Sequence, residues 1–134
     1  MISKIIEKTI HDQTQHYFSE NNLLYKYQSG FRSSYSTDYC LSFVSDTIAK
    51  GFDSGLYTGI ILIDLEKAFD TRDHEILIEK MKFLGFSENV VKWFQCYLSH
   101  RIFFVSINYS IANTGNVTCG VLQGSILGPL LFLL

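Results

Sequence analysis

The feature that most constrains this chain of 134 residues is the run 57–65, in which apolar side chains do not alternate with polar ones. Four consecutive aliphatic residues, 60–63, form its centre. Strands that are buried on both faces carry such continuous runs, whereas half-exposed strands alternate. The sequence therefore predicts a strand that is covered on both faces, with Asp64 at its C-terminal end.

An amphipathic helix is expected over residues 2–19, where apolar side chains recur at helical spacing. The apolar stripe consists of Ile2, Ile5, Ile6, Ile10, Tyr17 and Phe18. A second helix should begin at Ser36 and Thr37, because their side chains can cap a helix N-terminus. Its apolar face would consist of Cys40, Leu41, Val44 and Ile48. Gly51 and Gly55 would then end this helical pattern.

Two further helices are predicted between residues 73 and 99, each preceded by a residue that can cap its N-terminus. Asp73 precedes an apolar face that stops at Gly85, and Ser87 precedes a face that ends near Ser99. The first face consists of Ile76, Leu77, Met81 and Leu84, and the second of Val90, Val91, Phe94, Tyr97 and Leu98. Both helices should bury these faces in a common core.

A β-hairpin and a short helix are expected in the last third of the chain. Residues 103–107 and 117–121 are prone to form strands, and the polar residues 108–115 suit the connecting loop. Ser125 can cap a final helix, in which Pro129 falls in the first turn and removes no intrahelical bond. Helices combined with one buried strand and a hairpin indicate the α+β fold class.

Composition limits the classes of function. The hydrophobic share of 47% and the charged share of 18% indicate a globular core rather than a disordered tail. A net charge of -2 argues against binding nucleic acid through a broad positive field, so any phosphate contacts must be local. The apolar run 126–134 is shorter than the roughly 20 residues of a membrane span.

The cysteines indicate the compartment. Cys40, Cys96 and Cys119 are odd in number and lack C-x-x-C spacing, so neither a disulfide framework nor a zinc site is expected. A reducing compartment is the default, and we expect an intracellular protein of the cytoplasm or nucleus.

Two segments carry side chains suited to chemistry. Asp64 leaves the expected strand where a carboxylate can hold a hard cation, although an aspartate there can equally cap a helix or lie on the surface. The segment 120–132 places two glycines and Gln123 before a helix, which suits close approach of a ligand to the backbone. Alternatively, Gln123 simply hydrogen-bonds its own turn. Neither segment alone decides the function.

Taken together and in this order, the segments resemble the reverse transcriptases of non-LTR retrotransposons. Residues 28–32, Gln-Ser-Gly-Phe-Arg, with Ser36-Thr37 resemble the fingers motif of that family. Residues 64–70, Asp-Leu-Glu-Lys-Ala-Phe-Asp, with Asp73-His74 resemble the first palm motif, and residues 123–129, Gln-Gly-Ser-Ile-Leu-Gly-Pro, the second. The resemblance begins near Asn22, and residues 1–21 match more loosely.

The resemblance implies a right-hand polymerase fold, of which residues 1–134 would form a partial domain with the fingers and the first half of the palm. It implies an RNA-directed DNA polymerase that works by two-metal nucleotidyl transfer on an RNA template, a DNA primer and deoxynucleotides, with no membrane. Asp64 corresponds to the catalytic residue that binds both magnesium ions. Leu65, the next residue, would belong to the metal site through its backbone, which would contact the triphosphate of the incoming nucleotide.

Four residues resemble the family's nucleotide-binding set. Arg32 corresponds to a fingers arginine that clamps phosphates, a role that suits a planar, permanently charged donor. Phe69 corresponds to the steric gate that excludes a ribose 2′-hydroxyl. Gln123 and Gly124 correspond to the pair that lies against nucleotide and template. Asp70 is expected to hydrogen-bond local backbone rather than to bind metal.

The chain also departs from the family pattern. Leu122 stands where the family usually has proline, and Arg72 replaces an apolar β-branched residue, which suits a decaying copy of an element. The third palm motif, an aromatic-x-Asp-Asp turn, is expected beyond Leu134 together with the rest of the palm and the thumb. We therefore expect this piece to be inactive alone.

Two alternatives remain open. The first is a catalytically dead remnant that binds nucleic acid or a partner, which salt-dependent RNA binding lost in Arg32→Ala would support. The second is an unstable product in which the apolar residues 127–134 leave the core uncovered and aggregate.

Overall fold

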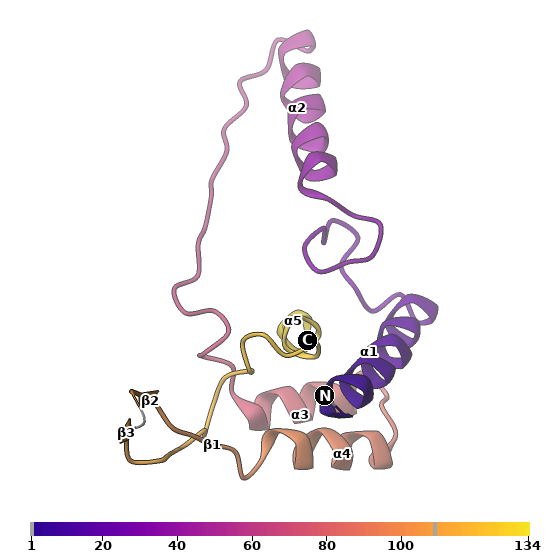
Figure 1. The fold of residues 1–134 in the computed structure, drawn as a ribbon. Helices are drawn as coiled ribbons and strands as arrows, with labels where there is room; N and C mark the ends of the chain where they lie inside the picture. The colour runs from indigo at the N-terminus through magenta and orange to yellow at the C-terminus, as the bar shows by residue number, and fades with distance from the viewer. Residues whose placement is uncertain (1, 109) are drawn as a thin grey trace. The chain divides into compact units, whose positions relative to one another are not determined.

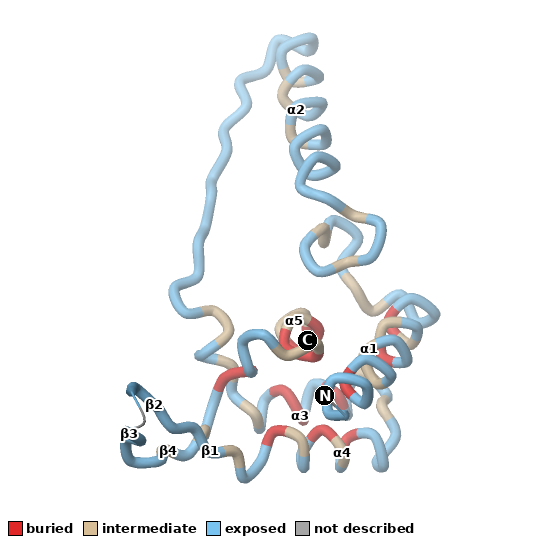
Figure 2. The backbone as a smooth tube through the Cα atoms, viewed as in Figure 1, coloured by how far each residue is buried: buried red, intermediate tan, exposed pale blue. Residues whose placement is uncertain are grey.

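The structure is a computed structural model, which describes residues 2–108 and 110–134. The chain divides into two compact units. One unit consists of Met1–Tyr17 with Lys67–Leu134, and the other of Phe18–Glu66. We call them the helical unit and the α2 unit. Figure 1 labels helices α1 to α5 and strands β1 to β3, and Figure 2 labels β4.

Helices α3 (His74–Phe83) and α4 (Glu88–Leu98) pack side by side in the helical unit (Figure 1). Burying each large apolar side chain of such a pair contributes about 1.5–3 kcal/mol. The buried side chains of the two helices are Leu77, Ile78, Met81, Val91, Phe94 and Leu98. The prediction of two helices that bury apolar faces is confirmed, except that Ile76 and Val90 of the predicted faces are 62% and 38% exposed, and that Ile78 is buried.

Identifiable residues determine where α3 begins and ends. The Asp73 carboxylate accepts hydrogen bonds from the backbone N–H of Glu75 at 2.8 Å and of Ile76 at 3.1 Å, so the predicted cap is confirmed. Gly85 follows the helix with φ +82, a left-handed conformation that favours glycine. Ser87 precedes α4, but its side chain makes no capping hydrogen bond. The expectation that Ser87 caps α4 as Asp73 caps α3 is wrong.

Helix α1 (Ile2–Glu20) forms where the sequence predicts it, and Phe18 of the predicted stripe is buried, but the first part of the stripe is not. Ile2, Ile5 and Ile6 of the predicted stripe are exposed, whereas Glu7 and Thr14 are buried. The Glu7 carboxylate accepts a hydrogen bond from the backbone N–H of Ile126 at 2.9 Å. This bond joins the Glu7 side chain to the C-terminal segment, whereas the three isoleucines are exposed.

Helix α5 (Gly128–Leu133) begins later than predicted. Pro129 lies in its first turn as expected. Ser125 stands before the helix, where its hydroxyl accepts from the Gly128 N–H at 2.8 Å and donates to the Leu122 carbonyl at 2.7 Å. Most residues of this segment are buried, and Figure 2 colours them red. Buried here are Leu127, Leu130, Leu131 and Leu134. The expectation that residues 127–134 leave an uncovered surface is therefore wrong.

The strands are short and exposed. β1 (Ile102–Phe103) pairs with β4 (Gly115–Asn116), and β2 (Ser106–Ile107) pairs with β3 (Ser110–Ile111), all antiparallel. Antiparallel pairing is present in the predicted region, but not between the predicted strands: residues 117–121 form no strand apart from the isolated bridge at Cys119, and the expected loop 108–115 contains β3 and the start of β4. Asn108 has φ +47, the left-handed conformation of tight hairpin turns, which brings the return strand closer.

Helix α2 (Thr37–Asp53) begins at the predicted cap, because the Ser36 hydroxyl accepts from the Tyr39 N–H at 3.2 Å. None of its residues is buried (Figure 2). Leu41, on the expected apolar face, is 63% exposed. The helix is thus confirmed and its buried face is not.

The strand predicted over residues 57–65 is wrong. This segment has neither helix nor strand, and Ile61 is 88% and Leu62 92% exposed. A strand covered on both faces needs neighbouring strands at its edges. In the α2 unit, the described residues form one helix, turns and irregular segments, so no such neighbour is present.

The combination of helices with small antiparallel strands agrees with the α+β class at this coarse level. None of the helices formed by residues 2–108 and 110–134 has the length and apolar character needed to cross a membrane.

Candidate functional site

Two predicted motifs that lie far apart in the sequence meet in the helical unit. The Val121 N–H donates to the Phe69 carbonyl at 2.8 Å, and the Gly120 N–H donates to the Arg72 carbonyl at 2.6 Å. Asp73 and Cys119 form an isolated antiparallel bridge beside these bonds. The backbone that follows the first palm motif is thus joined directly to the loop that carries the second.

Gly120 makes this close approach possible. Its φ is +84, and a Cβ atom at this position would lie 2.9 Å from both the Cα and the carbonyl oxygen of Asp70. Only glycine fits both conditions without strain. The His74 Nε2 lies 2.7 Å from the Gly120 carbonyl, so Nε2 carries the proton of this hydrogen bond. His74 is therefore a support of the loop rather than part of a solvated face.

Gln123 and Gly124 lie exposed at the tip of the loop. The Gln123 Nε2 donates to Asp70 Oδ1 at 3.4 Å, and the Asp70 N–H donates to the Lys67 carbonyl at 2.8 Å. Gly124 has φ +78 and open space where a Cβ would stand. The structure thus brings Gln123 to the turn that holds Asp70. The Asp70 carboxylate bonds this distant side chain, and it is the Asp70 N–H that bonds local backbone.

Phe69 packs against α5. Its ring stacks on that of Phe132 with centroids 4.8 Å apart and planes 23° from parallel. The Arg72 guanidinium lies over the Phe132 ring at 4.4 Å and donates to the Phe132 carbonyl at 2.9 Å. Such a cation–π contact contributes about 0.5–2 kcal/mol. Arg72, which departs from the family pattern, is therefore an ordered part of the support for Phe69.

Helix α1 holds the same loop from its other side. The Lys4 Nζ donates to the Gly124 carbonyl, and the buried Glu7 carboxylate binds the Ile126 N–H. Neither Lys4 nor Glu7 is among the site residues predicted from the sequence. A signal was present for Glu7, because it lies at helical spacing from Ile10 and Thr14 on the face that becomes buried.

The remaining predicted site residues belong to the α2 unit. Asp64 is exposed, and Leu65 is 62% exposed. The Arg32 guanidinium lies over the Tyr35 ring at 4.5 Å, and its Nη1 is buried without a hydrogen-bond partner among the described residues. The structure therefore gathers Phe69, Gln123 and Gly124 in one unit, and leaves Arg32, Asp64 and Leu65 in the other.

The fit to a metal site is partial. The Asp64 carboxylate and the Leu65 carbonyl are oxygen donors of the kind that hard cations take. Within residues 2–108 and 110–134, no three His, Cys, Asp or Glu side chains gather closely enough to hold a metal ion. The described residues thus supply donors of the right type but no complete set.

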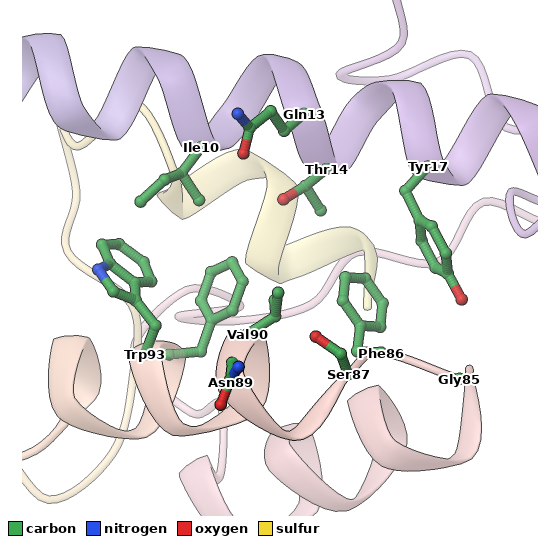
Figure 3. A pocket seen from close by; sticks show the side chains of 11 residues that line it. Ile10, Gln13, Thr14, Tyr17, Gly85, Phe86, Ser87, Asn89, Val90 and Trp93 are labelled. Atoms are coloured by element: carbon green, nitrogen blue, oxygen red, sulfur yellow. The ribbon is translucent and has the colours of Figure 1, made fainter.

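The aromatic residues of α4 belong mainly to the core, as predicted. Phe94 is fully buried, and Trp93 stacks on Tyr97 with centroids 5.3 Å apart. Burial raises the pKa of the Tyr97 phenol. Between α1 and α4 lies a cavity of about 560 Å³, to which Tyr17 and Phe86 contribute rings 4.6 Å apart (Figure 3). None of the predicted site residues lines this cavity.

The sequence profile of the reverse transcriptase (RNA-dependent DNA polymerase) family matches residues 1–134. A match over the full length shows that the chain belongs to the reverse transcriptase family. The resemblance to reverse transcriptases of non-LTR retrotransposons is confirmed.

Named relatives come from insect transposons. The chain is 34% identical over 131 residues to the probable RNA-directed DNA polymerase from transposon BS of Drosophila melanogaster. It is 32% identical over 139 residues to the probable RNA-directed DNA polymerase from transposon X-element of the same species. The RNA-directed DNA polymerase from mobile element jockey is 28% identical over 131 residues.

These matches cover 98–99% of this chain but 14% of each relative. The chain therefore corresponds to a small part of the length of the polymerases it resembles. No solved structure gives a significant match.

Proposed function

We propose that this chain supplies the fingers and the first half of the palm of a right-hand, RNA-directed DNA polymerase that copies RNA into DNA. The observation that carries the proposal is the junction in the helical unit, where hydrogen bonds join the Phe69 turn to the loop of Gln123. Two motifs that are separated in the sequence thereby form one continuous surface. The family membership and the names of the relatives support the same activity.

Nucleotide binding is the role we propose for Arg32, Phe69, Gln123 and Gly124. The half-buried Phe69 ring is held by Phe132, so it can act as a rigid wall against a 2′-hydroxyl. Gly124 leaves open space beside its backbone, and the Gln123 amide can donate or accept hydrogen bonds there. The Arg32 guanidinium would contact phosphate oxygens through its fixed donors.

Asp64 is the residue we propose as the catalytic metal ligand, with Leu65 contributing through its backbone. An exposed carboxylate after an apolar segment is free to take a cation that other carboxylates share. Magnesium ions, when bound, would activate the primer 3′-hydroxyl and neutralise charge on the leaving pyrophosphate. By the family resemblance, the remaining ligands would be further carboxylates of the intact polymerase.

A chimeric polymerase tests this proposal. The 131-residue segment that matches this chain in the transposon BS polymerase would be replaced by this chain, and primer extension on an RNA template with Mg²⁺ would be measured. We expect extension with deoxynucleotides. A folded chimera that binds primer and template but never extends the primer would contradict the proposal.

The same chimera tests the role of Phe69. Phe69→Ala should raise the use of ribonucleotides relative to deoxynucleotides by at least about tenfold, because the wall against the 2′-hydroxyl is lost. Phe86→Ala, which removes a ring outside the junction, is the control and should leave that ratio unchanged. Equal ratios in both variants would rule out Phe69 as the gate.

A further inference from the structure

Two charged side chains of helix α1 bind the backbone of the loop that carries the second palm motif. The Lys4 Nζ donates a hydrogen bond to the Gly124 carbonyl. The Glu7 carboxylate accepts a hydrogen bond from the Ile126 N–H at 2.9 Å. Lys4 and Glu7 are three positions apart on the helix, so their side chains lie on the same face. One face of α1 therefore binds two successive peptide groups of the loop.

The tip of this loop is a turn, residues 122–125, which its own hydrogen bonds close. The Ser125 N–H donates to the Leu122 carbonyl at 3.2 Å, and the Ser125 hydroxyl donates to the same carbonyl at 2.7 Å. Gly124, at the third position of the turn, has φ +78, as type II turns require there. The Gly124–Ser125 peptide is therefore bound through its carbonyl by Lys4 and through its N–H by Leu122.

The donors at the tip of the turn remain available to a ligand. Among the described residues, the N–H groups of Gln123 and Gly124 form no backbone–backbone hydrogen bond. No heavy atom lies within 4 Å of the place where a Cβ of Gly124 would stand. The Gln123 amide reaches Asp70 only at 3.4 Å, which is long for a hydrogen bond. The contacts from α1 thus fix the turn without occupying its donors.

We propose that Lys4 and Glu7 are positioning residues for nucleotide binding, which hold the turn 122–125 in the place where its donors contact the incoming deoxynucleotide. The inference rests on the proposed function, because that function assigns nucleotide binding to Gln123 and Gly124. A turn that is fixed before the nucleotide arrives loses less conformational freedom on binding, so the affinity for the nucleotide rises. Lys4 and Glu7 act through the turn and do not contact the reacting atoms.

Lys4 is the more informative of the two residues. Glu7 is buried, so its replacement affects the stability of the helical unit as well as the turn. Lys4 is exposed, and its replacement should affect mainly the turn. Lys8, one helical turn further along α1, is a matched control. It is also exposed, and its Nζ pairs with Asp12 at 2.8 Å rather than with the loop. Exposed pairs of this kind contribute little to stability.

Steady-state primer extension by the chimeric polymerase tests the inference. Lys4→Met should raise the KM for deoxynucleotides at least about fivefold and change kcat less than about twofold, because ground-state binding is weakened. Lys4→Arg keeps a charged donor and should return KM to within about twofold of the unsubstituted chimera. Lys8→Met should also stay within about twofold. An unchanged KM in Lys4→Met, or an equal rise in Lys8→Met, would overturn the inference.

These outcomes separate the inference from the proposed function. Extension by the unsubstituted chimera supports the proposed function whatever Lys4→Met does, so an unchanged KM in that variant overturns this inference alone. A folded chimera that binds primer and template but never extends the primer contradicts the proposed function, and the role in nucleotide binding is contradicted with it.

Hydrogen exchange in the chain itself tests the hold of Lys4 on the turn without polymerase activity. Exchange at the Ser125 and Ile126 amides should accelerate at least about threefold in Lys4→Met and remain unchanged in Lys8→Met, because only Lys4 binds the loop. The melting temperatures of both variants should stay within about 3 °C of the unsubstituted chain. Unchanged exchange at both amides in Lys4→Met would show that Lys4 does not position the turn.

Discussion

The sequence predicts three helices equally well: α3 and α4 of the helical unit, and α2 of the other unit. Only α3 and α4 bury side chains. α3 and α4 bury three residues each, whereas α2 buries none of its 17 residues. Most helical stability in proteins comes from packing an apolar face rather than from propensity. The difference shows that periodicity and caps predict where a helix lies, while its contribution to stability depends on the surface available to it.

Substituting one phenylalanine in each unit tests most directly whether the helical unit is packed more tightly than the α2 unit. Phe94→Ala empties a fully buried position of α4 and should lower the free energy of unfolding by about 3–5 kcal/mol. Phe52→Ala removes a ring of α2 that is 76% exposed and should change it by less than about 0.5 kcal/mol. Urea unfolding followed through Trp93, the single tryptophan, would measure both. Similar losses in the two variants would mean that the α2 unit is packed as tightly as the helical unit.

Substitutions of two glycines in the same loop test how closely the backbone is packed within the helical unit. Gly120→Ala should cost about 2–4 kcal/mol, because a left-handed residue acquires a Cβ that collides with the Asp70 backbone. Gly124→Ala should cost about 1–2 kcal/mol, because its conformation is also left-handed but its surroundings are open. Thermal unfolding would compare them. A larger loss in Gly124→Ala would contradict the close approach at Gly120.

The hydrogen bond between Glu7 of α1 and the Ile126 N–H can be tested for its contribution to holding the loop that carries Gln123. Glu7→Ala removes the acceptor of the Ile126 N–H and should lower stability by about 1–3 kcal/mol. Glu7→Gln keeps a carbonyl oxygen at the same place and should lose less. Hydrogen exchange at the Ile126 amide should accelerate in Glu7→Ala and remain closer to wild type in Glu7→Gln. Unchanged exchange in Glu7→Ala would show that this bond does not hold the loop.

The smallest effects on stability are expected from the residues that cap helices. Substituting one cap in each unit distinguishes the two units. Asp73→Ala should lower the free energy of unfolding of the helical unit by about 1 kcal/mol, since it frees two N–H groups of α3. Ser36→Ala should cost a similar amount, but only locally in α2. Hydrogen exchange resolved by residue would distinguish them. Faster exchange throughout α3 and α4 in Ser36→Ala would contradict the independence of α2.

Local features could be predicted from the sequence because their causes are local. Asp73 and Ser36 cap the helices that follow them, and Pro129 lies in the first turn of α5, as their chemistry requires. The junction between the Phe69 turn and the Gln123 loop could be expected only through the family resemblance. The bonds of Lys4 and Glu7 join residues more than a hundred positions apart, and no local pattern specifies them.

The strand expected over residues 57–65 shows why other features could not be predicted. Its apolar composition favours burial on both faces, but burial depends on strands contributed by other segments, and the described residues of this unit supply none. Similarly, the sequence alone predicted that the apolar run 127–134 would leave the core uncovered, whereas the structure buries four of its leucines within the helical unit. Which apolar segment lies inside is a property of the assembled unit, not of the segment.

The role of Asp64 is the claim on which the proposed function depends most. Primer extension by the chimeric polymerase, measured with Asp64→Asn and with Glu66→Gln as the matched exposed carboxylate, tests it directly. We expect Asp64→Asn to lower the rate by at least about a hundredfold, since a ligand of both metal ions is lost, and Glu66→Gln to leave it nearly unchanged. An Asp64→Asn chimera that extends the primer at the unsubstituted rate would contradict the proposed metal site.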